Sequence, residues 1–223
     1  MKTLRTFENQ IALHSNILKN TTVFVITLAV LFSTASFSLA NQVGTSQLMR
    51  YAAKLSQSGK NKEALKIFLE ITHKEPNNFY AYNNLGMVHS EMQEDDKALK
   101  AYEKSLSINP AFPMTLNNIG YLHMTMGHYD KAEMFLKKAS SLFGSFHLAL
   151  TNLGELYLKQ KRYSEAMTYL KKSLKNMPTF APTHKLLGEL HQAEGRKDEA
   201  KKEFKLFRKL NQKAKYSNIE INN

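Results

Sequence analysis

The chain has 223 residues, 43% of them hydrophobic, and a formal net charge of +12. This length fits one compact domain or one short repeat array. Because the sequence contains no cysteine, it excludes disulfide bonds, thiolate zinc sites, cysteine nucleophiles and a lipid anchor on cysteine.

The segment 1–40 differs in kind from the rest of the chain. Basic residues at positions 2, 5 and 19 precede an uncharged stretch whose most apolar part is 23–32, and Ser38-Leu39-Ala40 supplies small residues after it. This order is typical of a secretory signal, so we expect residues 1–40 to be a signal peptide cleaved after Ala40, with 33–35 as a second cleavage site.

Two alternatives to a cleaved signal stay open. Residues 21–40 are uncharged and about long enough to cross a bilayer, so they could form an uncleaved inner-membrane anchor. In both cases the basic leading segment stays inside and the rest of the chain faces the far side of the membrane, the periplasm of a bacterium. A cytoplasmic protein with a wrongly assigned start is the other alternative. A short linker is expected at 41–44.

A pattern of constant period follows the linker. In each of four copies a glycine follows Leu or Ile, an alanine lies twelve residues beyond it, and a large apolar residue comes four later. The equally spaced glycines are Gly86, Gly120, Gly154 and Gly188, and the alanines are Ala98, Ala132, Ala166 and Ala200. An earlier copy is degenerate, with Tyr51-Ala52 in place of Leu-Gly. Self-similarity of this kind indicates a stacked repeat array.

Each copy reads as two short helices joined by a turn. In the second copy, apolar residues from Tyr82 to Met92 are spaced by three and four, and a second stripe runs from Ala98 to Leu106. Small residues at Gly86 and Ala98 would let the two backbones approach closely. One such pair cannot bury its apolar face alone, so the pairs are expected to stack into a solenoid with a concave groove lined by the first helices.

The pattern resembles the tetratricopeptide repeat family, which combines Leu-Gly in a first helix, Ala and an aromatic in a second helix, and Pro at the exit. The resemblance implies an all-α, right-handed α-solenoid of five helix-turn-helix repeats, at 45–78, 79–112, 113–146, 147–180 and 181–212, followed by a basic and polar tail at 213–223. Local departures are Gly144 and Gln212 in place of the exit proline, and His89, His123 and His191 in place of the aromatic that Tyr157 keeps.

A row of carboxamides is expected along the groove, since Asn84, Asn118 and Asn152 all lie two residues before a glycine. Carboxamides both donate and accept hydrogen bonds, so the row could bind the backbone of an extended peptide, as the family's asparagine ladders do. The alternative is that they bond neighbouring repeats. Arg50 takes this place in the first repeat. The predicted adaptable lining, which could instead pack between helices, is Tyr80, Met87, Met114, Tyr121, Met124, Leu148 and Leu158.

No catalytic residue, metal site or cofactor is expected, and the chain is not predicted to be an enzyme. The lysine of Gly59-Lys60 lacks the glycine and the hydroxyl residue of a phosphate loop. The three histidines that share one place lie on helices expected about 8–10 Å apart, too far for a shared zinc unless both side chains reach inward.

The expected function is a protein-interaction scaffold that binds an extended or helical segment of another protein or peptide. Family members exported in this way commonly serve pilus, secretion or outer-membrane assembly. One alternative is self-association through apolar residues of the last helix, Leu206, Phe207 and Leu210. Another is weak membrane binding through the lysine-rich second helices, which otherwise form a solvated face. Nucleic acid is not expected, because no aromatic residues are interleaved with these cations.

Overall fold

The computed structural model describes residues 44–142 and 146–220, with side chains as far as residue 213. Throughout these ranges the regular structure is helical, which confirms the predicted all-α fold. The helices are α2 (Thr45–Gln57), α3 (Asn61–Lys74), α4 (Phe79–Glu91), α5 (Asp95–Ile108), α6 (Pro113–Thr125), α7 (Tyr129–Leu142), α8 (His147–Lys159), α9 (Tyr163–Asn176), α10 (Ala181–Ala193) and α11 (Lys197–Glu220). The predicted signal or anchor at 1–40 lies outside the described residues. Of the helices described, none combines the length and apolarity that a bilayer span requires.

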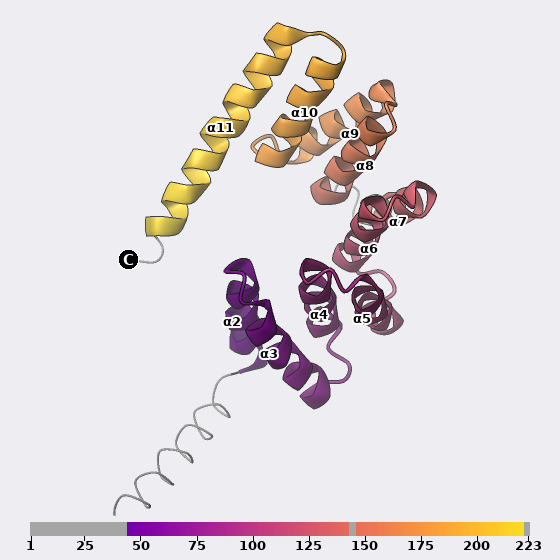
Figure 1. Cartoon of the computed structure of the whole chain (residues 1–223), viewed down its shortest axis with the longest axis vertical. Helices are drawn as coiled ribbons and strands as arrows, with labels where there is room; N and C mark the ends of the chain where they lie inside the picture. Colours follow the sequence, from indigo (N-terminus) through magenta and orange to yellow (C-terminus); the bar gives the residue numbers. More distant parts are fainter. Residues whose placement is uncertain (1–43, 143–145, 221–223) are drawn as a thin grey trace, which may run out of the picture. The chain divides into compact units, whose positions relative to one another are not determined.

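Helices α4 to α11 form four helix pairs that lie side by side in Figure 1. The chain divides into two compact units, Met1–Tyr51 and Ala52–Asn223, and these pairs belong to the second unit. The first helix of each pair has 13 residues and the second has 14, except for α11. Isolated helices of this length are marginal in water, so their stability comes from packing.

The repeated glycine and alanine meet where the two helices of a pair cross. A Cβ added to Gly120 would lie 2.7 Å from Cγ of Leu136 and 3.2 Å from the backbone oxygen of Ala132. Ala132 is fully buried on the opposite helix. The expected reason for the Gly and Ala spacing is therefore confirmed: only small residues leave room for the large side chain of the second helix.

Successive repeats are joined through their first helices as well as across their pairs. Helix α4 contacts α6, α6 contacts α8, and α8 contacts α10. One buried cluster runs through this stack from Met124 on α6 to Leu190 on α10. The outward sides of α4, α6, α8 and α10 thus form one continuous surface, called here the first-helix face.

The junctions between repeats alternate between polar and apolar. Where α5 meets α6, the hydroxyl oxygens of Ser105 and Thr115 lie 2.9 Å apart, and Ser173 and Thr183 repeat the contact at 3.1 Å between α9 and α10. At the junction between them, α7 and α8 place the fully buried Ala139 and Ala149 at the corresponding places. The chemistry of the junctions therefore repeats after every two helix pairs, not after every pair.

The turns inside the pairs follow the same alternation. Each turn has one residue in the left-handed region, with φ of 77° at Gly59, Gly127 and Gly195 but 60° at Gln93 and 59° at Lys161. Glycine reaches this conformation without the steric cost that a side chain carries. The first, third and fifth repeats therefore have glycine at the left-handed position of the turn. The second and fourth repeats have a residue with a side chain there.

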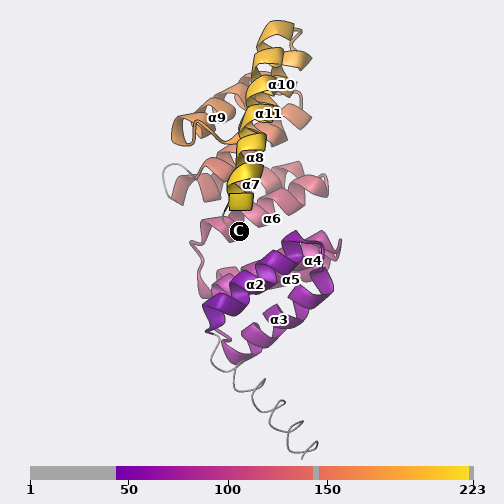
Figure 2. The same ribbon diagram turned by 90° about the vertical axis from the view of Figure 1, so that its left-hand side faces the viewer.

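Helix α11 is longer than every other helix in the described ranges, with 24 residues (Figures 1 and 2). No glycine or proline interrupts the sequence after residue 196, so nothing in it terminates the helix. Much of the segment expected as a tail, 213–223, is consequently helical as far as Glu220.

A buried histidine ties α11 to α10. Nδ1 of His184 lies 2.6 Å from the carboxylate of Glu203, and Nε2 lies 2.9 Å from the carbonyl oxygen of Pro178. A carbonyl only accepts hydrogen bonds, and so does an ionised carboxylate. The two contacts together fix α11 against the start of α10.

Candidate functional site

Apolar side chains lie exposed on the first-helix face, in stripes spaced by four and three residues. On α4 the stripe is Tyr80, Asn84 and Met87, and on α6 it is Met114, Asn118 and Tyr121. The four apolar members are between 38% and 51% exposed. Residues four and seven apart lie on one side of a helix, so the two neighbouring helices present adjacent apolar stripes to solvent.

Other predicted lining residues occupy different environments. Leu148 and Leu158 on α8 are half-buried, and Leu158 packs against the buried core cluster. Arg50, on the part of α2 that belongs to the first compact unit, is exposed. The lining is thus most open on α4 and α6.

Met124 was predicted to line the groove, and this is wrong. Its side chain is only 2% exposed and lies in the core cluster with Leu153 and Leu156 of α8. Met124 lies six residues after Asn118, the middle of the stripe, and six residues are about 1.7 helical turns, which places Met124 on a different side of α6, where the next repeat packs.

The asparagine row bonds the repeats to one another. Nδ2 of Asn118 donates to Oδ1 of Asn83 at 3.0 Å, and Nδ2 of Asn152 donates to Oδ1 of Asn117 at 2.9 Å. Both donors are half-buried, so part of each carboxamide still faces outward. The geometry gives Asn118 and Asn152 a structural role, and ligand contact by the row stays a prediction.

The acceptors of these bonds, Asn83 and Asn117, were not singled out from the sequence. Both are buried, and Oδ1 of Asn83 also accepts a 2.9 Å bond from the hydroxyl of Thr115. The doubled asparagine in NNLG and NNIG was visible in the sequence, as was the spacing of ten residues between Ser105 and Thr115, which Ser173 and Thr183 repeat. These signals could have identified the buried network.

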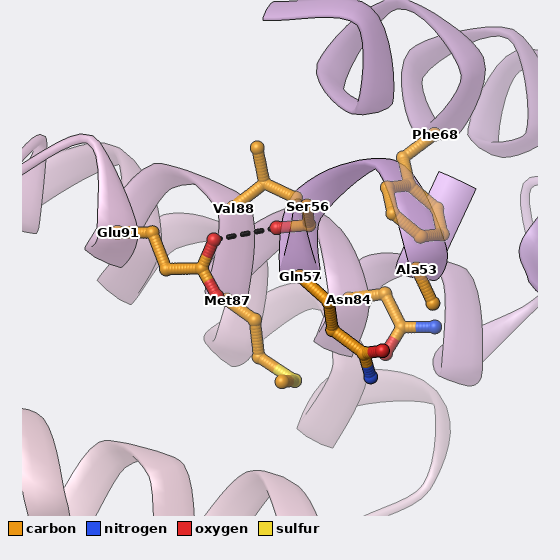
Figure 3. A pocket seen from close by; sticks show the side chains of 8 residues that line it. All are labelled: Ala53, Ser56, Gln57, Phe68, Asn84, Met87, Val88 and Glu91. Carbon is orange, nitrogen blue, oxygen red and sulfur yellow. Dashed lines mark hydrogen bonds between the residues drawn. The ribbon is translucent and has the colours of Figure 1, made fainter. Parts of the chain in front are cut away.

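A small pocket of about 60 Å³ opens where the end of α2 faces α4 (Figure 3). Its lining combines two carboxamides, a hydroxyl and a carboxylate with apolar side chains. The eight residues are Ala53, Ser56, Gln57, Phe68, Asn84, Met87, Val88 and Glu91. Asn84 and Met87 were predicted from the sequence, whereas the carboxylate of Glu91 and the α2 residues were not.

Charge on the described first helices is sparse compared with that on the second helices. Lysines of the second helices are exposed, and several pair with a carboxylate on their own helix, as Lys137 does with Glu133 at 2.6 Å. Exposed pairs of this kind contribute little stability. The basic surface is therefore mainly a solvated one, and it lies on the helices opposite the apolar stripes.

His89 and His123, which replace the usual aromatic, and Tyr157, which keeps it, each contact a different kind of residue five positions on. Nδ1 of His89 lies 2.6 Å from the carboxylate of Glu94. The rings of His123 and His128 lie 5.7 Å apart, and Arg162 stacks over Tyr157 at 4.4 Å. Nδ1 of His123 is buried without a hydrogen-bond partner, which leaves this ring in an unfavourable place for a charge.

Acidification is expected to destabilise the protein through His123. Burial, reinforced by Lys131 and His128, lowers the pKa of His123 below its ordinary value of 6.5. The unfolded chain then binds the proton more readily than the folded chain, so stability is lost as the pH falls below 6.5. Urea unfolding of wild type and His123→Tyr at about pH 7.5 and about pH 5 should show a smaller loss in the variant.

His73→Tyr is the matched control, because His73 is exposed on α3. The control should lose as much stability as wild type. Burial also lowers the pKa of His147 and of His191, so the His123 variant should retain some acid sensitivity. Equal losses in His123→Tyr and wild type would contradict the prediction.

Comparisons with known proteins agree with this architecture. Three sequence profiles described as tetratricopeptide repeat match residues 79–112, 112–179 and 157–219. No curated protein sequence matches the chain. Together the three profiles span most of the stacked helices.

Solved structures share the fold at low sequence identity. The pilF protein of Pseudomonas aeruginosa is 22% identical, with a TM-score of 0.66 over 74% of this chain and 75% of that one. PilW, described as a widely conserved type IV pilus biogenesis factor, is also 22% identical, with a TM-score of 0.66 over 75% and 78%. A repeat protein from Parabacteroides merdae is 19% identical, with a TM-score of 0.68 over 81% and 70%.

Proposed function

Because the chain belongs to the tetratricopeptide repeat family, we propose that it is a protein-interaction scaffold that binds a segment of another protein along its first-helix face. Stacked repeats of this kind present extended surfaces of fixed spacing. The partner segment lies across α4 and α6, where its apolar side chains contact the exposed stripes. Binding requires no chemistry from the chain, and the scaffold acts by holding its partner.

The exposed stripe of Tyr80, Met87, Met114 and Tyr121 carries this proposal. Large apolar side chains gathered on a soluble surface often mark an interaction site. Tyrosine supplies a large contact area at low entropic cost, and methionine adapts to partners of different shape. The half-buried carboxamides of the asparagine row lie beside the stripe and add hydrogen-bonding groups for a backbone.

The proposed setting is assembly of a bacterial envelope complex, such as a pilus. The expected signal or anchor at 1–40 favours export, with the repeats in the periplasm. The likeness in fold to pilF and to the pilus biogenesis factor PilW favours the same setting.

Removing the apolar stripe should abolish partner binding. We expect a first-helix variant, with Tyr80, Met114 and Tyr121 all changed to Ser, to lose at least about tenfold in recovery of the partners that wild type captures, because buried aromatic anchors dominate interface energies. The measurement is capture from an envelope extract with quantification of each protein. A matched second-helix variant changes three equally exposed apolar residues, Leu69, Met134 and Leu206, to Ser.

The two variants separate the proposal from its rival. The second-helix variant should capture the same proteins as wild type, and equal recovery by the first-helix variant would rule out the proposed surface. Capture of the chain's own copies that only the second-helix variant loses would favour self-association instead. The observation behind that rival is that Leu206 is exposed on α11, with Phe207 and Leu210 half-buried beside it.

A further inference from the structure

The described first helices carry three carboxylates, and one of them differs from the other two. Glu155 lies 3.6 Å from Lys159 and Glu189 lies 3.3 Å from Lys185, each on its own helix. Glu91, at the end of α4, has Met87 four residues before it and Asp95 four residues after it. In the part of the chain with described side chains, no basic group pairs with Glu91, which is exposed.

The carboxylate of Glu91 is nevertheless held in place. The hydroxyl of Ser56 donates to Oε2 at 2.5 Å, across 35 residues of sequence, as the dashed line in Figure 3 shows. A hydroxyl orients a carboxylate but leaves its negative charge unneutralised. The second oxygen of Glu91 keeps its capacity to accept a hydrogen bond from a ligand.

The rest of the pocket suits the stem and the head of one long side chain. Ala53, Met87 and Val88 supply apolar contacts, while Gln57 and Asn84 contribute carboxamide oxygens that can accept hydrogen bonds (Figure 3). At about 60 Å³ the pocket is well below the size of small-ligand sites. It accommodates a single amino-acid side chain better than a cofactor.

We propose that this pocket binds a lysine or arginine side chain of the partner segment, with Glu91 as its counter-ion. The aliphatic stem lies against Asn84 and Met87, and the cationic head reaches the free oxygen of Glu91. Long basic side chains pair apolar stems with charged heads in this way. The inference rests on the proposed function, because the side chain belongs to the segment on the first-helix face.

Charge complementarity decides between the possible occupants. A neutral apolar side chain would fill the space but leave the carboxylate without a counter-ion, and an acidic one would be repelled. Helix α4 contains neither lysine nor arginine, and the basic residues of α2 and α3, such as Lys54, are exposed and do not line the pocket. The cation that completes the site therefore comes from the partner.

Two blocked pentapeptides that differ only at the central residue test this inference. One is acetyl-Ala-Leu-Lys-Leu-Ala-amide, and the other has norleucine, which has an aliphatic side chain without the charge, in place of lysine. The full chain carries ¹³C-labelled methionine methyl groups, so the Met87 signal reports binding and the exposed Met114 serves as a reference. We expect the lysine peptide to bind about two- to fivefold more tightly, the usual range for an exposed ion pair, with the preference fading at high salt.

Two single variants isolate the carboxylate. Glu91→Gln keeps the shape of the side chain and should abolish the preference for lysine. Glu155→Gln removes a carboxylate that already has a lysine partner and should leave the preference intact. Absence of the preference in wild type, its persistence in Glu91→Gln, or no shift of the Met87 signal with either peptide would each overturn the proposal.

Failure of this inference can be told from failure of the proposed function. If Glu91→Gln captures the same envelope proteins as wild type and the peptides show no preference, the pocket claim is wrong while the scaffold role stands. If the lysine peptide binds at Met87 but partner capture does not depend on Tyr80, Met114 and Tyr121, the pocket claim stands and the proposed surface is wrong.

Discussion

Gly120→Ala is expected to lower the free energy of unfolding by up to about 2 kcal/mol, the net of a packing cost and a gain in helix propensity. The added Cβ would lie 2.7 Å from Cγ and 2.9 Å from Cδ2 of Leu136, so the Leu136 side chain or one of the two helices must shift. Overpacking a core costs about 1–3 kcal/mol, and the gain in helix propensity from Gly to Ala, about 1 kcal/mol, offsets part of this. Urea unfolding followed by helical circular dichroism measures the difference.

A double variant shows whether the crowding is the cause. Leu136→Ala alone should cost about 2–5 kcal/mol, because Leu136 is fully buried. In the Gly120→Ala background the cost should fall by at least about 1 kcal/mol, since the new methyl group occupies the vacated space. Gly44→Ala is the control, because a Cβ there meets nothing within 4 Å. Strict additivity of the two changes would contradict this account.

Asn83→Ala is expected to cost about 2–3 kcal/mol, because it leaves buried hydrogen-bonding groups unsatisfied. Asn83 is 2% exposed, and its Oδ1 accepts bonds from Thr115 at 2.9 Å and from Asn118 at 3.0 Å. Its removal leaves two donors without their acceptor, and a buried unsatisfied group costs about 1–3 kcal/mol. The measurement is again urea unfolding of the full chain.

The neighbouring residue provides the matched control. Asn84 is half-buried, and its nearest bond is a 3.4 Å contact with Asn83, so Asn84→Ala should change stability by less than about 0.5 kcal/mol. Thr115→Val, which removes one hydroxyl from the same network at nearly constant volume, should cost about 1 kcal/mol. Equal effects of Asn83→Ala and Asn84→Ala would show that the network does not hold the repeats together.

The fold could be predicted because its steric rule is local and repeated. Gly120, Ala132 and Leu136 must fit one crossing, and the same combination of glycine, alanine and a large apolar residue recurs at constant spacing. The candidate site was harder to predict, because two stripes on a first helix are both apolar. Tyr121 faces outward and Met124 faces the next repeat, and only the packing of α8 distinguishes the two sides.

The buried network was missed for a different reason. The constant place two residues before a glycine drew attention to Asn84, and Asn83 beside it was not considered. A buried carboxamide needs hydrogen-bond partners, and the acceptor of Asn83 finds them in Thr115 and Asn118 of the next repeat. Such partners are set by stacking. The same holds for Glu91, whose orientation depends on Ser56, 35 residues away.

The alternation of junctions restricts how the array can change in length. Deleting a single repeat would bring a hydroxyl-bearing second helix such as α5 against the alanine-bearing start of α8, leaving Ser105 without the Thr115 hydroxyl. Deleting two repeats would bring together partners of the kind that already meet. Shorter or longer forms of this protein should therefore arise by loss or duplication of two consecutive repeats at a time. Two helix pairs, and not one, are then the unit that a deletion or duplication can change without disturbing a junction.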